Sequence, residues 1–304
     1  MPAAGRRRDK LMYETIIDPA VLSSVAHLEL IARQAVEGSV SGLHHSRYQG
    51  RNVEFNEHRP YNPGDELRLV DWRVYAKTDR FHVKLFEEDT NLRALILTDL
   101  SGSMQFGAST ISKAAYARQL AAALSYLMLM QGDSVGLAVF DREMRGYIPP
   151  RHRSDQWGAL LETMFTVSPS TEESDIASVL SGMGELLKKR GMVILISDLI
   201  DEPAAVLKSL ALLRKRQQEI LVFHILAPEE VDLPYHGTVE FHALEGETDP
   251  LTTAPKRLRK KYQERIHEFL DEYRNGCLEQ GIDYTLIQTN RSLEDFLREY
   301  LQRR

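Results

Sequence analysis

The sequence predicts an α/β protein built on a doubly wound, mostly parallel sheet of the Rossmann-like kind. Short aliphatic runs alternate along the chain with segments of helical pattern, as such a sheet requires. In the first unit, residues 94–98 are mostly aliphatic, the composition of a strand buried on both faces, and a helical pattern rich in Ala, Leu and Met covers about 109–130. Because ligands of doubly wound sheets bind at the carboxyl ends of the strands, the turn between these two segments is the first candidate site.

The remainder of the chain continues the alternation up to its end. Further strands are predicted at 134–140, 192–198, 220–226 and 283–288, and helices at 155–165, 176–189, 203–217 and 293–301. Residues 227–261 form a strand-containing insertion, and a helix is expected at about 255–275. We therefore assign residues 91–304 to the main domain.

Residues 1–90 are predicted to be an N-terminal helical and strand segment that packs on the main domain. Asp18 and Pro19 suit the first positions of a helix that extends to about residue 37. Alternating residues at 80–86 predict a strand. We interpret His44 and His45 as part of a surface loop, because adjacent residues rarely converge on one metal ion.

Basic and aromatic residues are interleaved between residues 47 and 84, a mixture that can bind single-stranded nucleic acid. Acidic residues in the same stretch cancel the positive charge, so we favour an internal ion-pair network. The net charge of −6 for the whole chain likewise argues against a nucleic-acid partner.

Composition and cysteine usage favour a cytoplasmic protein without membrane insertion. Hydrophobic residues make up 43% and charged residues 27% of the 304 residues, as in an ordinary globular protein. Cys277 is the only cysteine, which fits a reducing compartment. We see no signal peptide behind Arg6–Arg8, and the most apolar run, 120–130, is shorter than the ~20 residues that span a bilayer.

The turn after the first strand places one carboxylate and two hydroxyls at alternate positions, Asp99, Ser101 and Ser103. Oxygen ligands of this kind suit a hard cation such as Mg²⁺, or Mn²⁺ in its place. This D-x-S-x-S turn resembles the metal-ion-dependent adhesion site (MIDAS) of von Willebrand factor type A domains. The resemblance implies a type A-like version of the doubly wound fold.

Two further loops are expected at the same edge of the sheet. The strand at 192–198 ends in Asp198 much as the first strand ends in Asp99, and the two aspartates would be close if the strands are neighbours. The loop before residue 176 offers Ser174, with Thr171 nearby. The type A resemblance implies that Ser101, Ser103 and Ser174 bind the ion, with Asp99 and Asp198 contacting it directly or through water. Type A domains have threonine where this chain has Ser174, so Thr171 is the alternative ligand.

Helix capping is the simpler explanation for some of these residues. Ser and Asp are common at helix N-termini, where they accept hydrogen bonds from free N–H groups. Asp133, Ser174 and Asp175 are in positions where capping alone would explain them. We favour the metal site because Asp198 ends a second strand and because of the family resemblance described next.

The residues before the first strand carry a more specific resemblance. They read Glu57-x-Arg59-x-Tyr61-x-Pro63-Gly64-Asp65, followed by Arg68, Asp71-Trp72 and Ala76. This order resembles the bacterial domain of unknown function 58 (DUF58) family. In that family the segment precedes a type A-like domain, and the genes often lie beside those of MoxR-type AAA+ ATPases. The resemblance thus implies a MoxR-type ATPase as partner.

The sequence does not show the motifs of common enzymes. A haloacid dehalogenase-type phosphotransferase needs a second aspartate where this chain has Ser101, and neither a nucleophile elbow nor a Walker motif is present. Asp141, Arg142, Glu143 and Arg145 either line the same crevice or are solvated loop charges. We predict a non-catalytic interaction module whose Mg²⁺ binds an Asp or Glu of a partner. The alternatives are a Mg²⁺-dependent phosphoester hydrolase and a structural subunit with a vestigial metal site.

Overall fold

The computed structural model describes residues 53–60, 72, 74, 75, 79, 81–88, 92–107, 111–246 and 249–303. They fall into two compact units, one holding the described residues up to Leu92 and the other those from Arg93 onward. The predicted helix at 18–37 and the pair His44–His45 lie outside the described residues. The packing of residues 1–90 on the main domain, like the choice between ion pairs and nucleic-acid binding at 47–89, stays a prediction.

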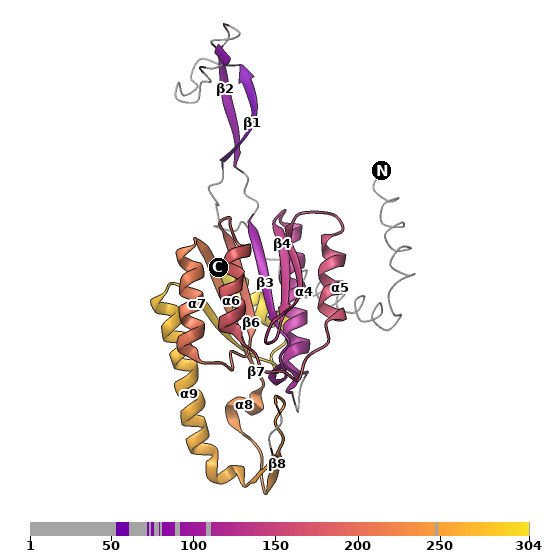
Figure 1. Ribbon diagram of the computed structural model, residues 1–304, viewed down its shortest axis with the longest axis vertical. Coiled ribbons are helices and arrows are strands. Elements are labelled where there is room, and N and C mark those ends of the chain that lie inside the picture. The colour runs from indigo at the N-terminus through magenta and orange to yellow at the C-terminus, as the bar shows by residue number, and fades with distance from the viewer. Residues whose placement is uncertain are drawn as a thin grey trace, which may run out of the picture. The chain divides into compact units, whose positions relative to one another are not determined.

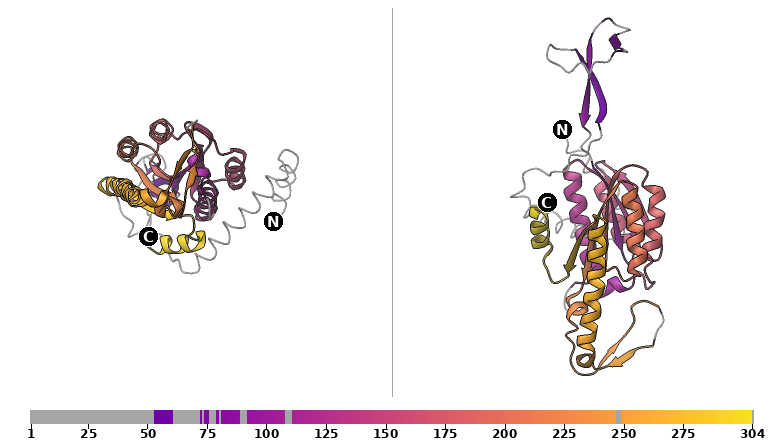
Figure 2. Two further views of the ribbon diagram at one scale, coloured as in Figure 1. Left: turned by 90° about the horizontal axis from the view of Figure 1, so that it is seen from below. Right: turned by 90° about the vertical axis from the view of Figure 1, so that its left-hand side faces the viewer.

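The larger unit is a doubly wound sheet with helices on both faces, which confirms the predicted fold class (Figures 1 and 2). The six strands follow the order β10-β7-β6-β3-β4-β5, and every pair of neighbours is parallel except β4 and β5. The strands are β3 (Arg93–Asp99), β4 (Ser134–Phe140), β5 (Met144–Arg151), β6 (Gly191–Ser197), β7 (Gln218–Leu226) and β10 (Asp283–Gln288).

The helices connect these strands in the order the sequence predicts. They are α4 (Lys113–Met130), α5 (Gln156–Thr166), α6 (Ile176–Leu186), α7 (Pro203–Lys215), α8 (Pro228–Asp232), α9 (Pro255–Glu279) and α10 (Leu293–Arg303), with a short 3₁₀ turn, η2 (Ser103–Gln105). Helix α4 begins after Ser112, whose hydroxyl accepts a hydrogen bond from the amide of Ala115 at 3.2 Å. The helix therefore begins later than the predicted residue 109. In the part of the chain that the structure describes, no helix is both long and apolar enough to cross a membrane.

The core lies on both faces of β3 and β6. Leu95 and Leu97 of β3 pack with Val193 and Leu195 of β6 in one cluster, to which α6, α7 and α9 contribute their apolar faces. The alternate residues Ala94 and Ile96 are fully buried too, which explains why the strand reads as a continuous aliphatic run. From β3 the chain continues to β4 on one side, and from β6, the neighbour of β3 on its other side, it continues to β7 in the opposite direction. The switch point of the sheet therefore lies at the carboxyl ends of β3 and β6.

The edge strand β5 was not among the predicted elements. Its sequence, MRGYIPPR, contains Pro149 and Pro150, which lack the N–H groups that a central strand needs. The structure places it at the edge of the sheet, antiparallel to β4 and mostly exposed or half-buried. An edge strand tolerates proline, and this is why the sequence signal was weak.

The predicted insertion is a small hairpin beside the start of α9. Strands β8 (Val239–Phe241) and β9 (Leu251–Thr253) pair antiparallel. The chain before the hairpin is held by α9, because the Arg259 guanidinium donates to the carbonyls of Leu233 and Tyr235, at 3.0 and 2.9 Å. The strand-containing insertion is therefore confirmed, with α9 beginning at the predicted residue 255.

The described residues of the smaller unit include an antiparallel hairpin. Strands β1 (Val53–Pro60) and β2 (His82–Glu88) pair with a bulge between Phe55 and Glu57. The predicted strand at 80–86 thus exists and begins at residue 82. The rings of Trp72, Tyr75 and Phe81 pack together, with Tyr75 stacked on Phe81 at a centroid distance of 4.3 Å.

Candidate metal centre

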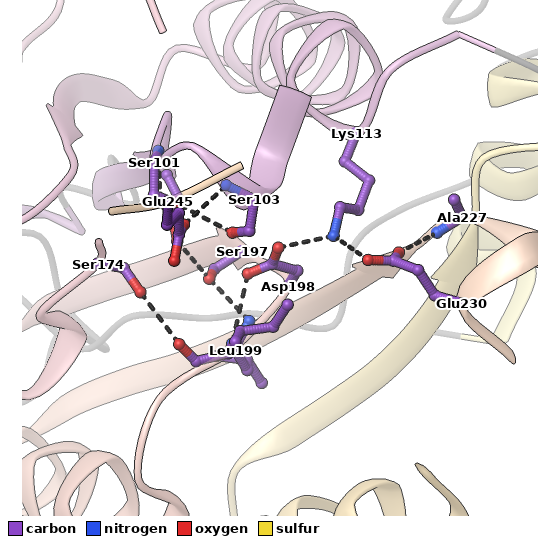
Figure 3. A network of polar contacts seen from close by, with 12 residues as sticks. Ser101, Ser103, Lys113, Ser174, Ser197, Asp198, Leu199, Ala227, Glu230 and Glu245 are labelled. Atoms are coloured by element: carbon purple, nitrogen blue, oxygen red, sulfur yellow. Dashed lines mark hydrogen bonds and ion pairs between the residues drawn. The ribbon is translucent and has the colours of Figure 1, made fainter. Parts of the chain in front are cut away.

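The turn that follows β3 gathers its polar groups in the interior of the protein. The Asp99 Oδ1 atom accepts a hydrogen bond from the Ser101 amide at 2.9 Å. The hydroxyls of Ser101 and Ser103 are 3.2 Å apart and hydrogen-bonded to each other (Figure 3). Asp99 and Ser101 are fully buried, and Ser103 is 8% exposed. The predicted carboxylate and two hydroxyls therefore lie side by side at the carboxyl end of the strand.

The carboxyl end of β6 lies next to this turn, because β3 and β6 are parallel neighbours. The residue that touches Asp99 is Ser197, whose hydroxyl donates to Asp99 Oδ2 at 2.6 Å. The Leu199 amide in turn donates to the Ser197 hydroxyl at 2.9 Å. Sequence reasoning missed Ser197, although the register pairs Thr98 with Ile196 and so places Ser197 opposite Asp99.

Asp198 is paired with a buried lysine of the larger unit. Its Oδ2 atom lies 2.7 Å from the Lys113 ammonium, and both side chains are fully buried. The same ammonium lies 2.5 Å from Glu230 Oε1 of α8, and Glu230 Oε2 accepts from the Ala227 amide at 2.7 Å (Figure 3). Burial alone would lower the pKa of Lys113, but the two carboxylates outweigh it and raise this pKa above its ordinary value.

Lys113 was not identified from the sequence as part of the site. The available signal was its position in α4, where it is spaced four and seven residues from the buried Ala117 and Leu120 and so lies on the buried face of the helix. A charged residue at such a position needs a partner, because an unpaired buried charge is costly. Asp198 and Glu230 are those partners.

Asp99 carries the site's least compensated charge. Burial, and next the nearby charge of Asp198, raise the pKa of Asp99 to about 7, against hydrogen bonds from Ser197 and Ser101 that lower it. In the described part of the chain, the Asp99 carboxylate accepts hydrogen bonds from hydroxyl and amide groups, whereas Asp198 has an ammonium partner. A cation beside Asp99 would favour its ionised form.

The loop before α6, which is the second loop of the predicted site, contacts the loop after β6, which is the third. The Ser174 hydroxyl donates to the carbonyl of Ile200 at 3.2 Å, so it lies against the segment that follows Asp198. Thr171 is exposed, and its carbonyl accepts a weak hydrogen bond from Gly246 at 3.4 Å. Asp175 caps α6 by accepting from the Ser178 amide at 2.9 Å, as the capping explanation expected. Which of Ser174 and Thr171 would face an ion stays a prediction.

The insertion hairpin contributes a residue that sequence reasoning did not assign to the site. Glu245 Oε1 accepts a hydrogen bond from the Ser103 amide at 2.7 Å (Figure 3). The two residues are 142 positions apart, so no motif spacing could have connected them. A third carboxylate is thus present at the turn in addition to Asp99 and Asp198.

The donor set fits a magnesium ion. Two adjacent oxygen ligands of an octahedral Mg²⁺, each at about 2.1 Å, lie about 3 Å apart. The 3.2 Å between the Ser101 and Ser103 hydroxyls is close to this separation. In the described ranges, no group of three His, Cys, Asp or Glu side chains could hold a metal ion by itself. An ion at this turn would therefore bind the hydroxyl oxygens as well. Such oxygens suit Mg²⁺ or Mn²⁺ better than Zn²⁺.

The charges that follow β4 divide into two kinds. Arg142, Glu143 and Arg145 are exposed, as expected for solvated loop charges. Asp141 is different, because it is buried and its Oδ2 atom lies 2.9 Å from the Arg145 guanidinium. Asp141 is therefore a structural residue of this loop, and the solvated-charge interpretation was wrong for it.

Comparisons with known proteins identify relatives of uncharacterised function. The model of the family "Protein of unknown function DUF58" matches residues 57–269. Uncharacterized protein Rv1480 of Mycobacterium tuberculosis is 30% identical over 226 residues, which cover 74% of this chain and 71% of that protein. Uncharacterized protein Mb1516 of Mycobacterium bovis matches with the same identity and coverage.

Two of the solved structures to which this chain is similar come from Bacteroides species. The conserved hypothetical protein BatB of Bacteroides thetaiotaomicron is 16% identical, with a TM-score of 0.47 over 70% of this chain and 98% of that one. An aerotolerance-related membrane protein of Bacteroides fragilis is 15% identical, with a TM-score of 0.44 over 70% of this chain and 100% of that one.

Proposed function

We propose that this chain, which belongs to the DUF58 family of proteins of unknown function, is a non-catalytic protein-interaction module of the von Willebrand factor type A kind. In this proposal the turn after β3 holds Mg²⁺ or Mn²⁺. Ser101 and Ser103 would hold the ion together with a hydroxyl of the second loop, Ser174 or Thr171. Asp99 and Asp198 would contact it directly or through water. A bound ion would offer a coordination position to an aspartate or glutamate of a partner protein.

The observation that carries the proposal is the pairing of the Ser101 and Ser103 hydroxyls beside the buried carboxylate of Asp99. Buried polar groups of this kind need partners, and a hydroxyl pair next to an uncompensated carboxylate offers oxygen ligands to a hard cation. The location, at the switch point of the sheet, is where ligands of doubly wound folds bind.

The role of Asp198 within the proposal is indirect. Its Oδ2 atom is engaged by Lys113 and its Oδ1 atom accepts from the Ile200 amide at 3.3 Å. We therefore expect Asp198 to act on the ion through water and through its charge, and Ser197 to orient the Asp99 carboxylate.

A non-catalytic role is supported by the sequence around the two serines, which forms neither a nucleophile elbow nor a Walker motif. The resemblance of the chain to proteins encoded beside MoxR-type AAA+ ATPases makes such an ATPase the partner that we propose.

A pull-down with a MoxR-type ATPase from the same genome tests this function. We expect the ATPase to bind the wild-type chain in the presence of Mg²⁺. This binding should be lost in EDTA, and it should be lost with Asp99→Ala. The control is Asp155→Ala, which removes an exposed carboxylate whose side chain makes no capping hydrogen bond. Binding that survives both EDTA and Asp99→Ala would reject the metal-bridged contact. Hydrolysis of a generic phosphoester that disappears in Asp99→Ala would instead favour the hydrolase alternative.

A further inference from the structure

The loop of the insertion hairpin lies directly on the metal-binding turn. A Cβ atom added to Gly102 would be 2.4 Å from the Leu244 carbonyl oxygen and 2.7 Å from Glu245 Cγ. Real Cβ atoms do not approach other atoms so closely, so the fit depends on glycine at this position. The dihedral angles of Gly102, φ −58° and ψ −42°, are ordinary for any residue. Close approach of the hairpin, and not backbone conformation, is therefore what requires glycine here.

The contact is made by a carboxylate at the place where the proposed function needs one. Glu245 Oε1 accepts from the Ser103 amide at 2.7 Å, and Ser103 carries one of the two paired hydroxyls. Figure 3 shows the Glu245 side chain beside Ser101 and Ser103. An acidic side chain that comes from a distant part of the chain thus occupies the neighbourhood of the proposed ion. A partner's aspartate or glutamate would have to occupy the same neighbourhood.

The hairpin is small and only partly anchored. Each of its strands has three residues, and a two-stranded hairpin of this size is marginally stable in isolation. The Phe241 ring of β8 packs edge-on against Tyr235, whose carbonyl accepts from Arg259 of α9, but Leu244 is 41% and Leu251 61% exposed. Among the described residues of the loop, Glu245 contacts the turn after β3 and Gly246 contacts the loop before α6.

From this geometry we propose that Glu245 is an internal occupant of the partner's coordination position, and that the hairpin loop must leave before an acidic partner residue binds. This inference rests on the proposed function and adds a regulatory device to it. When the ion is bound, Glu245 completes its ligands and holds the loop closed. A partner carboxylate competes with Glu245 for one position.

The test compares Mn²⁺ binding to the full chain and to Glu245→Gln. The substitution keeps the size of the side chain and removes its charge. We expect the Kd for Mn²⁺ to rise about tenfold, and the addition of the acidic peptide Ac-Gly-Gly-Glu-Gly-Gly-NH₂ to restore part of the affinity in the variant but not to change it in the wild type. The matched control is Glu240→Gln, which removes an exposed charge from the same hairpin. Its Kd should stay within twofold of the wild-type value.

Hydrogen exchange of residues 242–246 and of the Ser103 amide provides a second readout. In the wild type, Mn²⁺ should slow exchange at both places, and in Glu245→Ala this slowing should be lost. Equal Mn²⁺ affinity in wild type and Glu245→Gln, with the same Mn²⁺-dependent slowing in Glu245→Ala, would overturn the inference and leave the proposed function intact. Absence of Mn²⁺ binding in wild type and variants alike would overturn the proposed function itself and the inference with it.

Discussion

At the scale of single residues, the charges of the site are organised by the ammonium of Lys113. It lies between the carboxylates of Asp198 and Glu230, and its side chain is fully buried. Taking three charged groups out of water is costly, and their attraction offsets this cost only while all of them are present. The lysine also joins α4, the helix after the turn that follows β3, to α8, in the segment that leads into the insertion.

Replacement of Lys113 should therefore destabilise the fold strongly. We expect Lys113→Met to lower the free energy of unfolding by about 3–5 kcal/mol, because it leaves the buried carboxylate of Asp198 and the half-buried carboxylate of Glu230 without a cation. Urea denaturation measures the loss. The control is Lys208→Met, which removes an exposed lysine from α7 and should change stability by less than about 0.5 kcal/mol. A loss below 1 kcal/mol for Lys113→Met would mean that the ammonium is not what compensates Asp198 and Glu230.

Gly102 tests the contact between the turn and the hairpin without removing a ligand. In Gly102→Ala the added methyl group must displace the Leu244 carbonyl or the Glu245 side chain. We expect faster hydrogen exchange at the Ser103 amide, because the atom nearest the added methyl group is a backbone oxygen that only a shift of the hairpin loop can move away. Exchange at Ser103 that is as slow as in the wild type would show that the hairpin does not protect this amide.

At the scale of the elements, the sequence predicts best what is buried on both faces. The strand predicted at 134–140 has the bounds of β4, and the bounds of β3 and β6 differ from the predicted ones by one residue. These strands could be predicted because a short, continuous aliphatic run is typical of a strand in a sheet covered on both faces. The edge strand β5 carries two prolines and only half-buried residues, so its pattern is weak. Asp99, Ser101 and Ser103 could be predicted because they lie at alternate positions in one turn.

The remaining contacts of the site depend on tertiary structure. Ser197 reaches Asp99 through strand register, Lys113 reaches Asp198 through the packing of α4, and Glu245 reaches Ser103 through the fold of the insertion. No short sequence pattern records any of these three. The similarity of the endings of β3 and β6 indicated the right edge of the sheet, but it suggested Asp198 where the residue that touches Asp99 is Ser197.

A glycine of α9, Gly276, tests the packing between α7 and α9, and Gly182 of α6 is its control. A Cβ atom at Gly182 of α6 meets nothing within 4 Å, whereas one at Gly276 of α9 would lie 2.4 Å from a methyl group of Leu207 in α7. We expect Gly182→Ala to stabilise the protein by about 0.5–1 kcal/mol through helix propensity. Gly276→Ala should be net destabilising, because overpacking costs about 1–3 kcal/mol. Thermal unfolding measures both, and equal stabilisation by the two substitutions would contradict close packing of α9 on α7.

At the scale of the whole molecule, the stability of the protein depends on pH through a histidine that is buried in the sheet. His224 of β7 is fully buried, its Nδ1 atom is 2.8 Å from the Tyr284 hydroxyl of β10, and the rings of Phe269 and Tyr273 pack against it. Burial lowers the pKa of His224 from 6.5 to about 4. The folded protein thus holds this imidazole neutral at pH values where the unfolded chain protonates it.

The contribution of His224 to the stability of the protein should therefore fall on acidification. The contribution of His224 is present above pH 6.5 and is lost as the pH falls toward 4, by about 3 kcal/mol at most. The Asp99 carboxyl, whose pKa is raised, changes stability in the opposite direction over this range. The measurement is the difference in unfolding free energy between wild type and His224→Gln at pH 7.5 and pH 4.5. A difference that does not change with pH would contradict a neutral buried imidazole.

The central claim is that the turn after β3 binds a divalent cation, and calorimetric titration of Mn²⁺ tests it most directly. The account predicts one Mn²⁺ per wild-type chain, lost in the double variant Ser101→Ala/Ser103→Ala. It should be retained in Ser181→Ala, which removes an exposed hydroxyl of α6 that is bonded to the Ala177 carbonyl and to Ser209. Absence of binding by the wild type, or equal binding by the double variant, would contradict the claim.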